Sequence, residues 1–331
     1  MAILHDAIIG SLWCMVMIPG TSPRAMPGST VTAPWRARAV LLAVATMLTT
    51  GASLHAARGE DQAPAGAAPA AVPVAAKVTA APRPDCPSAN FRMAVDVGHT
   101  LDAPGALSAR GVTEYAFNLQ LAQNIKQALV GAGFAKTELL ITDKKPPLGL
   151  FDRAAAANRT GADLFLSVHH DSVPDNLIKT WQYEGQDEGY NDDYRGYALF
   201  VSKDNAEPAG SLQFGHLLGK ALQTRGVEFT PHYTLKRMGS HRRELLDADG
   251  GVYRFDQLVV LRYTHMPAVL LEAGSIVNRQ EELELATPER RAATSAAVVS
   301  AVEDFCAERA HSKTERLAKR PAGAHARAGM R

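Results

Sequence analysis

Histidines and a glutamate stand directly after three apolar segments of the chain. His99 follows "AVDVG", the pair His169 and His170 follows "LFLSV", and Glu272 follows "AVLL". Glu114 stands at the start of a segment whose apolar residues have helical spacing. Two imidazoles and a carboxylate with an open fourth position form a common catalytic zinc set, and a further glutamate is the base that metal-assisted hydrolysis uses. These residue types therefore predict a metal site with hydrolytic chemistry.

The segment "LFLSVHHDS", residues 164–172, offers two histidines for one ligand position. In a strand, Phe165, Ser167 and His169 share one face, but this alternation is loose at a strand's end. We therefore expect one of the two histidines to ligate the metal. The other histidine, which could be His170, could form a hydrogen bond or contact the substrate.

Each candidate side chain also has an ordinary structural interpretation. A single histidine at a strand end is more often a surface residue, and Glu114 alone would be a first-turn carboxylate that the helix dipole stabilises. Glu272 follows an apolar run with no cation beside it in the sequence, and burying an unpaired carboxylate is costly, which favours a function. Asp96 could orient a ligand histidine or cap a helix or loop, and Asp171 is a further candidate for holding a ligand or contacting substrate.

The elements that must bring these residues together alternate between strands and helices. The predicted elements are strands at 91–99, 137–143, 163–170 and 196–204, one or two strands within 257–276, and helices at 113–134, 150–162, 208–227 and 287–305. This order predicts one α/β domain with a largely parallel sheet flanked by helices. In such sheets, functional groups collect at the carboxyl ends of the strands, which is where the candidate residues stand.

Residues 1–57 have the layout of a secretory signal region. Arg36 and Arg38 precede "AVLLAVATMLTTGASLHAA", an apolar stretch flanked by small residues. The apolar core is short compared with the roughly 20 residues that a membrane span requires, although an uncleaved anchor is the alternative. A protein that started at Met26 would have a typical signal sequence with a short basic leader. We expect export, and the Ala/Arg-rich composition suits the periplasm of a Gram-negative bacterium.

Two further segments are expected to lie outside the folded domain, which we place at residues 86–306. Residues 58–85 are Ala/Pro-rich with almost no large apolar side chains, so they cannot offset their ordering entropy and are expected to be a linker. Residues 307–331 carry seven Lys/Arg against two Asp/Glu and predict a basic, mostly disordered tail. Subtracting this local +5 from the whole chain's +1 leaves −4 elsewhere. This balance gives no electrostatic reason to expect nucleic acid as a partner.

The cysteines are few and lie near the borders of these segments. Of the three, Cys14 lies in the signal region, whereas Cys86 and Cys306 stand at the two ends of the expected domain. In an oxidising compartment the last two could pair, and two free, half-buried thiols are the alternative.

Two polar segments could border the metal site. Residues 173–197 include "TWQYEGQDEGYNDDYRGY" and could grip glycan or peptide, occlude the site, or form a mobile surface loop. The segment at 225–247 carries Arg237, Arg242 and Arg243, whose charge would suit the carboxylates of a peptide. The alternative for this segment is a solvated basic face.

Three blocks of the sequence resemble the signature blocks of the zinc-dependent N-acetylmuramoyl-L-alanine amidases, the AmiC-like cell-wall hydrolases. The blocks are "AVDVGHT…GVTEYAFNLQLAQNI", "ADLFLSVHHDS" and "VLRYTHMPAVLLEAGSIVNRQE", within about residues 92–305. By this resemblance, His99, Glu114 and His169 are the zinc ligands and Glu272 is the catalytic glutamate.

The chain departs from the family's pattern at several positions. Val97 stands in place of a proline in the first block, and "TLDAPGALSARG" follows His99. Ser275 stands where the third block usually has an aromatic residue, and "SVHHD" replaces Ser-Ile-His-Ala-Asn. None of these changes removes a ligand. Arg153 matches an arginine common in the family, for which we expect a structural role.

The resemblance implies Zn²⁺-dependent hydrolysis of the amide bond between N-acetylmuramic acid and L-alanine in peptidoglycan or muropeptides. Glu272 would act first as general base and then as general acid. We expect a monomer, and the need for a protein activator is open. The alternatives are another zinc amidohydrolase or carboxypeptidase acting on N-acyl amino acids, and a non-catalytic peptidoglycan-binding module whose site has decayed around His99.

Overall fold

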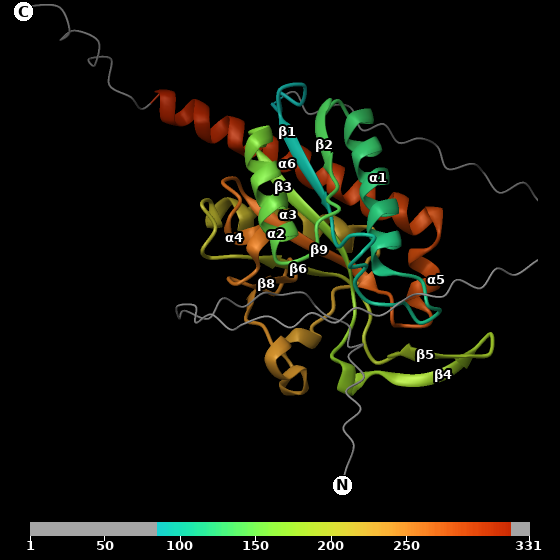
Figure 1. Ribbon diagram of the computed structural model, residues 1–331. Coiled ribbons are helices and arrows are strands. Elements are labelled where there is room, and N and C mark those ends of the chain that lie inside the picture. The colour runs from blue at the N-terminus through green and yellow to red at the C-terminus, as the bar shows by residue number, and fades with distance from the viewer. Residues whose placement is uncertain (1–84, 319–331) are drawn as a thin grey trace, which may run out of the picture. The chain divides into compact units, whose positions relative to one another are not determined.

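A seven-stranded sheet lies at the centre of residues 85–318, the part of the chain that the structure describes. In this computed structural model the strand order is β2-β1-β3-β9-β6-β8-β7 (Figure 1). The strands are β1 (Arg92–Val97), β2 (Lys136–Leu140), β3 (Leu164–Asp171), β6 (Ala198–Val201), β7 (Leu245–Asp247), β8 (Val252–Arg254) and β9 (Ala268–Ser275). Only the β6–β9 and β7–β8 pairs are antiparallel. This arrangement confirms the predicted α/β fold with a largely parallel sheet.

Helices cover both faces of this sheet (Figure 1). They are α1 (Glu114–Gly131), α2 (Leu148–Thr160), α3 (Pro208–Thr224), α4 (Val259–Arg262), α5 (Glu281–Leu285) and α6 (Pro288–Ala318). α1, α3 and α6 pack around a core that includes Leu121, Phe214 and Phe305. α2 and α4 belong to a second core, which includes Phe165 and Leu261. Because both faces are covered, the central strands are continuous apolar runs, and every residue of β9 is buried.

We predicted one or two strands within residues 257–276, and the structure has one strand there, β9. Val259 to Arg262 form the short helix α4, and the strand β9 begins after Pro267. The side chains of Val259, Val260 and Leu261 are buried, and a short buried helix cannot be distinguished from a buried strand by its apolar pattern.

A separate two-stranded sheet follows β3. Its strands, β4 (Lys179–Tyr183) and β5 (Gln186–Tyr190), pair antiparallel and follow the single turn η1 (Asp175–Leu177). Figure 1 shows this hairpin apart from the helices that cover the central sheet. Much of the predicted loop 173–197 is therefore regular structure. The sequence also gave no indication of β7, β8, α5 or the 3₁₀ helices η2 (His232–Thr234) and η3 (Lys236–His241).

The last helix, α6, continues beyond the predicted domain boundary to Ala318. The first part of the basic segment 307–331 is therefore helical, in contrast to the disorder that we expected. The sequence "AERAHSKTERLA" consists largely of Ala, Glu, Lys and Arg, which favour helices and can extend one that is already formed. Residues 319–331 lie outside the described part of the chain.

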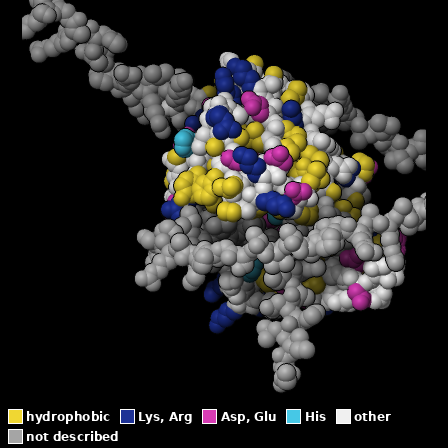
Figure 2. Space-filling model, in the orientation of Figure 1, with side chains coloured by type: hydrophobic (Ala, Val, Ile, Leu, Met, Phe, Trp, Pro, Cys, Tyr) yellow, Lys and Arg dark blue, Asp and Glu magenta, His cyan; other side chains and the backbone are white. Residues whose placement is uncertain are grey.

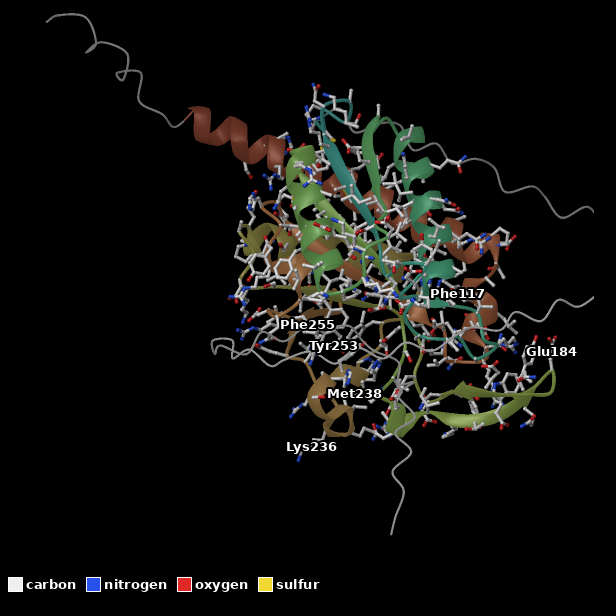
Figure 3. All side chains as sticks on the ribbon, viewed as in Figure 1. Phe117, Glu184, Lys236, Met238, Tyr253 and Phe255 are labelled. Carbon is white, nitrogen blue, oxygen red and sulfur yellow. A yellow bond between two sulfur atoms is a disulfide. The ribbon has the colours of Figure 1, made fainter. Side chains whose placement is uncertain are left out.

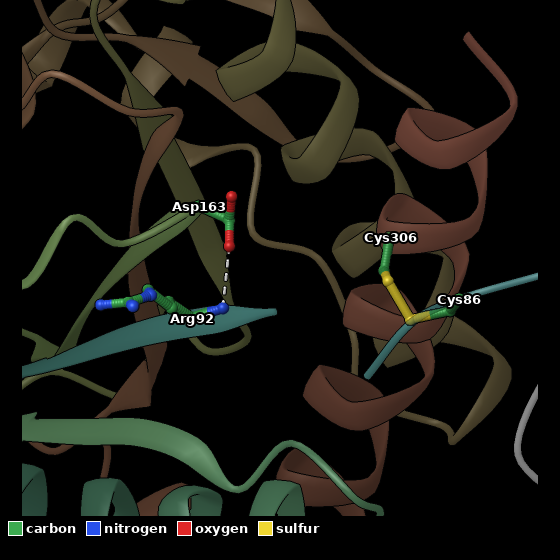
Figure 4. The surroundings of a disulfide bond; sticks show 4 residues. All are labelled: Cys86, Arg92, Asp163 and Cys306. Carbon is green, nitrogen blue, oxygen red and sulfur yellow. Dashed lines mark hydrogen bonds between the residues drawn. A yellow bond between two sulfur atoms is a disulfide. The ribbon is translucent and has the colours of Figure 1, made fainter. Parts of the chain in front are cut away.

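A disulfide bond joins the two ends of the domain. Cys86, just before β1, is bonded to Cys306 on α6, across a sequence separation of 220 residues (Figure 4). Of the two alternatives left by the sequence, the structure has the pair and not two free thiols.

The predicted signal region and almost all of the predicted linker lie outside the described residues. Within residues 85–318, no helix combines the length and apolar character that crossing a membrane requires. On the face seen in Figure 2, basic and acidic side chains are interspersed with apolar ones, in keeping with the chain's formal net charge of +1.

Candidate active site

Three of the predicted site residues come together at the carboxyl edge of the sheet. His99 follows the end of β1, His169 lies near the end of β3, and Glu114 is the first residue of α1. One ligand atom from each lies within 4.8 Å of the others. His99 Nε2 is 2.9 Å from Glu114 Oε2, and His169 Nδ1 is 3.0 Å from Glu114 Oε1. The group could therefore hold a metal ion.

Two glycines allow the backbone to approach these side chains closely. A Cβ atom on Gly98 would lie 2.5 Å from the ring of His169, and one on Gly105 would lie 2.4 Å from Oε2 of Glu114. Gly105 has a φ of +80°, and His99 itself has a φ of 66°, which is uncommon for a residue with a side chain. The loop after β1 thus folds tightly around the ligand group.

The ionisation of Glu114 and of His169 favours metal binding. Burial alone would raise the pKa of Glu114, but the charges and hydrogen bonds of His99 and His169 outweigh it and hold that pKa well below its usual range. Burial lowers the pKa of His169, with Glu114 opposing it. An ionised carboxylate and neutral imidazoles are the forms that coordinate metals.

Glu272 lies on β9 beside His169, its partner in the register of β3 and β9. Its side chain is 2% exposed, and Oε2 has no hydrogen-bond partner among residues 85–318. Burial raises the pKa of Glu272 well above its usual range, and the carboxylates of Asp171 and Glu114 add to this effect. A buried carboxyl with a raised pKa can both accept and return a proton.

Asp96 lies under the ligand group but contacts it indirectly. It accepts a hydrogen bond of 2.7 Å from Ser167 Oγ, and its Oδ1 is 3.7 Å from Arg153 Nε. Arg153 Nη2 in turn donates to the backbone carbonyl of His99. Among the described residues we find no hydrogen bond between Asp96 and His99 or His169, so Asp96 supports His99 through Arg153.

His170 and His169 point to different partners. His170 Nδ1 lies 2.8 Å from Asn118 Oδ1, and Asn118 Nδ2 donates to Glu114 Oε1 at 3.1 Å. Burial lowers the pKa of His170 to about 3, so the ring is neutral and its Nδ1–H donates to Asn118. His170 thus orients the amide that holds Glu114 in place.

Asp171 contacts the segment at 225–247, which we expected to border the site, through two residues that the sequence did not single out. The hydroxyl of Tyr233 donates to Asp171 Oδ1 at 2.6 Å, and His232 Nε2 lies 3.5 Å from Asp171 Oδ2. Burial raises the pKa of Asp171 to about 8. We considered this segment for its arginines alone, and no motif distinguishes Tyr233 or Asn118 from other buried polar residues.

The fold and the site together define an α/β domain with a candidate metal-dependent hydrolase site at its carboxyl edge. The model of the N-acetylmuramoyl-L-alanine amidase family matches residues 93–304. The chain belongs to this family.

Known relatives agree with this assignment, and a solved structure has the same fold. The chain is 25% identical over 219 residues to the amidase AmiC of Neisseria meningitidis, covering 64% of this chain and 51% of AmiC. It is 27% identical over 234 residues to the amidase AmiA of Escherichia coli, covering 66% of this chain and 78% of AmiA. The crystal structure of the amidase Ami1 from Mycobacterium smegmatis has the same fold, with a TM-score of 0.50 at 19% identity, covering 66% of this chain and 98% of Ami1. The match thus spans about half the length of AmiC.

Proposed function

We propose that this chain hydrolyses the amide bond between N-acetylmuramic acid and L-alanine in peptidoglycan or muropeptides. The observation that carries the proposal is the convergence of His99, Glu114 and His169 beside the buried Glu272, in a chain of the amidase family. AmiC, AmiA and Ami1 are named as amidases for this bond, which supports the same reaction here.

We further propose that His99, Glu114 and His169 bind Zn²⁺. Two imidazole nitrogens and one carboxylate oxygen are a donor set that suits catalytic zinc and leaves a position open. The pKa of Glu114, held well below its usual range, keeps this carboxylate ionised. Bound there, zinc supplies Lewis-acid chemistry that polarises the amide carbonyl and makes water more acidic.

In this mechanism, Glu272 moves the proton. Its carboxylate accepts a proton from the attacking water as the water oxygen bonds to the carbonyl carbon. It then returns that proton to the amine nitrogen of L-alanine as the C–N bond breaks. The products are the lactyl carboxylate and the free stem peptide. The raised pKa of Glu272 supports both steps, because its carboxylate is then a stronger base toward the water and its carboxyl keeps the proton until it is transferred to the amine nitrogen.

The decisive variant is Glu272→Gln, which keeps the size of the side chain and removes the base. We expect it to retain zinc and to lose roughly 100-fold or more of the activity. Mass spectrometry of digested peptidoglycan measures the stem peptides released. Glu289→Gln, an exposed glutamate on α6, is the matched control and should digest like the wild type. Equal release by Glu272→Gln and wild type would remove Glu272 from the mechanism.

The digest separates the proposed reaction from its two rivals when it is combined with assays of N-acyl amino acid cleavage, wall binding and metal content. A protein that cleaves N-acyl amino acids but releases no stem peptide from muropeptides would be a different zinc amidohydrolase or carboxypeptidase. A protein that binds cell wall, contains no metal and releases no peptide would be a wall-binding module.

We also propose that the protein acts outside the cytoplasm, in the periplasm. The disulfide between Cys86 and Cys306 supports this location, because structural disulfides persist in oxidising compartments. We expect a monomer. Digestion by the purified protein alone would test whether an activating partner is needed.

A further inference from the structure

The segment with η2 and η3 lies against the end of β3 that carries the candidate ligand His169. The contacts of Tyr233 and His232 with Asp171, two residues after His169, fix the start of this segment at the site. Figure 3 shows that Met238 lies closer to the sheet than Lys236, which is at the outer end of the segment. The segment therefore forms one border of the candidate active site.

Two of the three arginines of this segment are held by its own backbone. Arg242 Nε donates to the carbonyl of Thr234 at 2.9 Å. Arg243 Nη1 donates to the carbonyls of Ser240 and Arg242 at 2.7 Å and 2.9 Å, and its guanidinium lies 3.9 Å from the centre of the Phe255 ring. These two side chains therefore serve the fold of the segment.

Arg237 is exposed and its side chain, unlike those of Arg242 and Arg243, forms no hydrogen bond with the backbone of residues 85–318. Its guanidinium lies 5.0 Å from the centre of the Tyr194 ring, and we find no hydrogen bond or ion pair of Arg237 among residues 85–318. The Tyr194 ring is 4.9 Å from that of His232, which contacts Asp171. Burial lowers the pKa of His232 to about 4, and the positive charge of Arg237 contributes to this effect. Arg237 thus lies at the border of the site with its hydrogen-bonding edge available.

Three carboxyl groups lie at the sheet edge that this segment borders. Glu114, Asp171 and Glu272 are buried carboxyl groups at the same sheet edge. A substrate that carries carboxylates of its own needs a cation to bind beside them. A guanidinium binds a carboxylate through two parallel hydrogen bonds, and its contact with the Tyr194 ring restricts its motion in advance.

We propose that Arg237 binds a free carboxylate of the stem peptide and so selects acidic stem peptides over amidated ones. This inference rests on the proposed function, because it assigns Arg237 to the leaving-group peptide of that reaction. Lys236, the exposed neighbour of Arg237, has no such role.

The test compares two muropeptides that differ only in the stem peptide, whose carboxylates are either free or all converted to amides. For the wild type, we expect amidation to raise KM about tenfold with little change in kcat, the size of one charge-assisted contact. For Arg237→Met, KM for the free acid should rise about tenfold and the effect of amidation should disappear. Lys236→Met, which removes the same charge one residue away, should discriminate like the wild type.

Loss of general charge attraction would affect Lys236→Met and Arg237→Met alike, and that result would overturn the inference. An unchanged effect of amidation in Arg237→Met would also overturn it, as would a wild type indifferent to amidation. In these cases stem peptide is still released and the proposed function stands. If the wild type released no peptide from either muropeptide, the proposed function would be wrong and this inference with it.

Discussion

The buried carboxyl group of Asp171 makes the stability of the folded protein depend on pH. Its carboxyl is 1% exposed, and burial raises its pKa from the usual 3.8 to about 8. The folded protein therefore holds a proton on Asp171 that the unfolded chain has released. Between about pH 4 and pH 8 the folded state binds more protons, so the contribution of Asp171 to stability falls as the pH rises.

Asp171→Asn removes this titration while its side-chain oxygen can still accept from Tyr233. We expect the metal-free variant to be more stable than the wild type at pH 8, by about 1 kcal/mol or more, and to lose that advantage near pH 4. Thermal unfolding across this pH range measures the difference. A constant difference in melting temperature at all pH values would show that Asp171 is ionised when buried.

Some of the site residues could be predicted from the sequence and others could not. His99, Glu114, Glu272 and the pair His169 and His170 were candidates because each follows or begins an element that the apolar pattern reveals, and the family resemblance selected His169 from the pair. Asn118 was not a candidate, because a polar residue inside a helix acquires a role only through a partner that is distant in the sequence, here His170.

At the scale of elements, the β4–β5 hairpin supports the loop beside the candidate metal ligands. Trp181 Nε1 donates to the carbonyl of Ala109 at 2.8 Å. The guanidinium groups of Arg110 and Arg279 lie 5.4 Å and 5.1 Å from the centre of the Trp181 ring. Figure 3 places Glu184 at the far tip of the hairpin, away from Phe117 on α1. Trp181 therefore connects the middle of β4 to the loop between β1 and α1.

Trp181→Ala removes this connection. We expect faster hydrogen exchange in the hairpin and in residues 100–112, and a loss of about 3 kcal/mol of stability at most, because Trp181 is only partly buried. Thr180→Ala, on the opposite face of β4, is the control and should exchange like the wild type. Unchanged exchange in residues 100–112 of Trp181→Ala would mean that the loop is held by other contacts.

Elements with strong periodicity were predictable, and those that depend on tertiary contacts were not. The strand at 163–170 and the helix at 113–134 agree closely with β3 and α1. The hairpin was not predicted because "KTWQYEGQDEGY" is largely polar, and its aromatic face is covered by arginines from elsewhere in the chain. The helix α4 resembled a strand because burial removes the polar face that reveals a helix.

At the scale of the whole molecule, one covalent bond closes nearly the entire domain. The bond between Cys86 and Cys306 joins the start of the domain to α6, which packs on α1 and α3. A crosslink across 220 residues restricts the unfolded chain strongly, and the chain-entropy model gives an upper value of about 5 kcal/mol.

The double variant Cys86→Ser, Cys306→Ser should therefore unfold at lower temperature, with a loss of about 2–5 kcal/mol. Thermal unfolding of this variant, compared with the oxidised and the reduced wild type, measures the effect. The reduced wild type should match the variant. An unchanged melting temperature after reduction would show that the bond adds no stability.

The most direct test of the account is the zinc affinity of His169→Ala and His170→Gln, measured by competition with a chromogenic chelator and compared with the wild type. We predict about one zinc ion per wild-type chain, its loss in His169→Ala, and its retention in His170→Gln, since only His169 faces Glu114 and His99. Zinc bound equally tightly by His169→Ala would contradict the assignment of these three residues as its ligands.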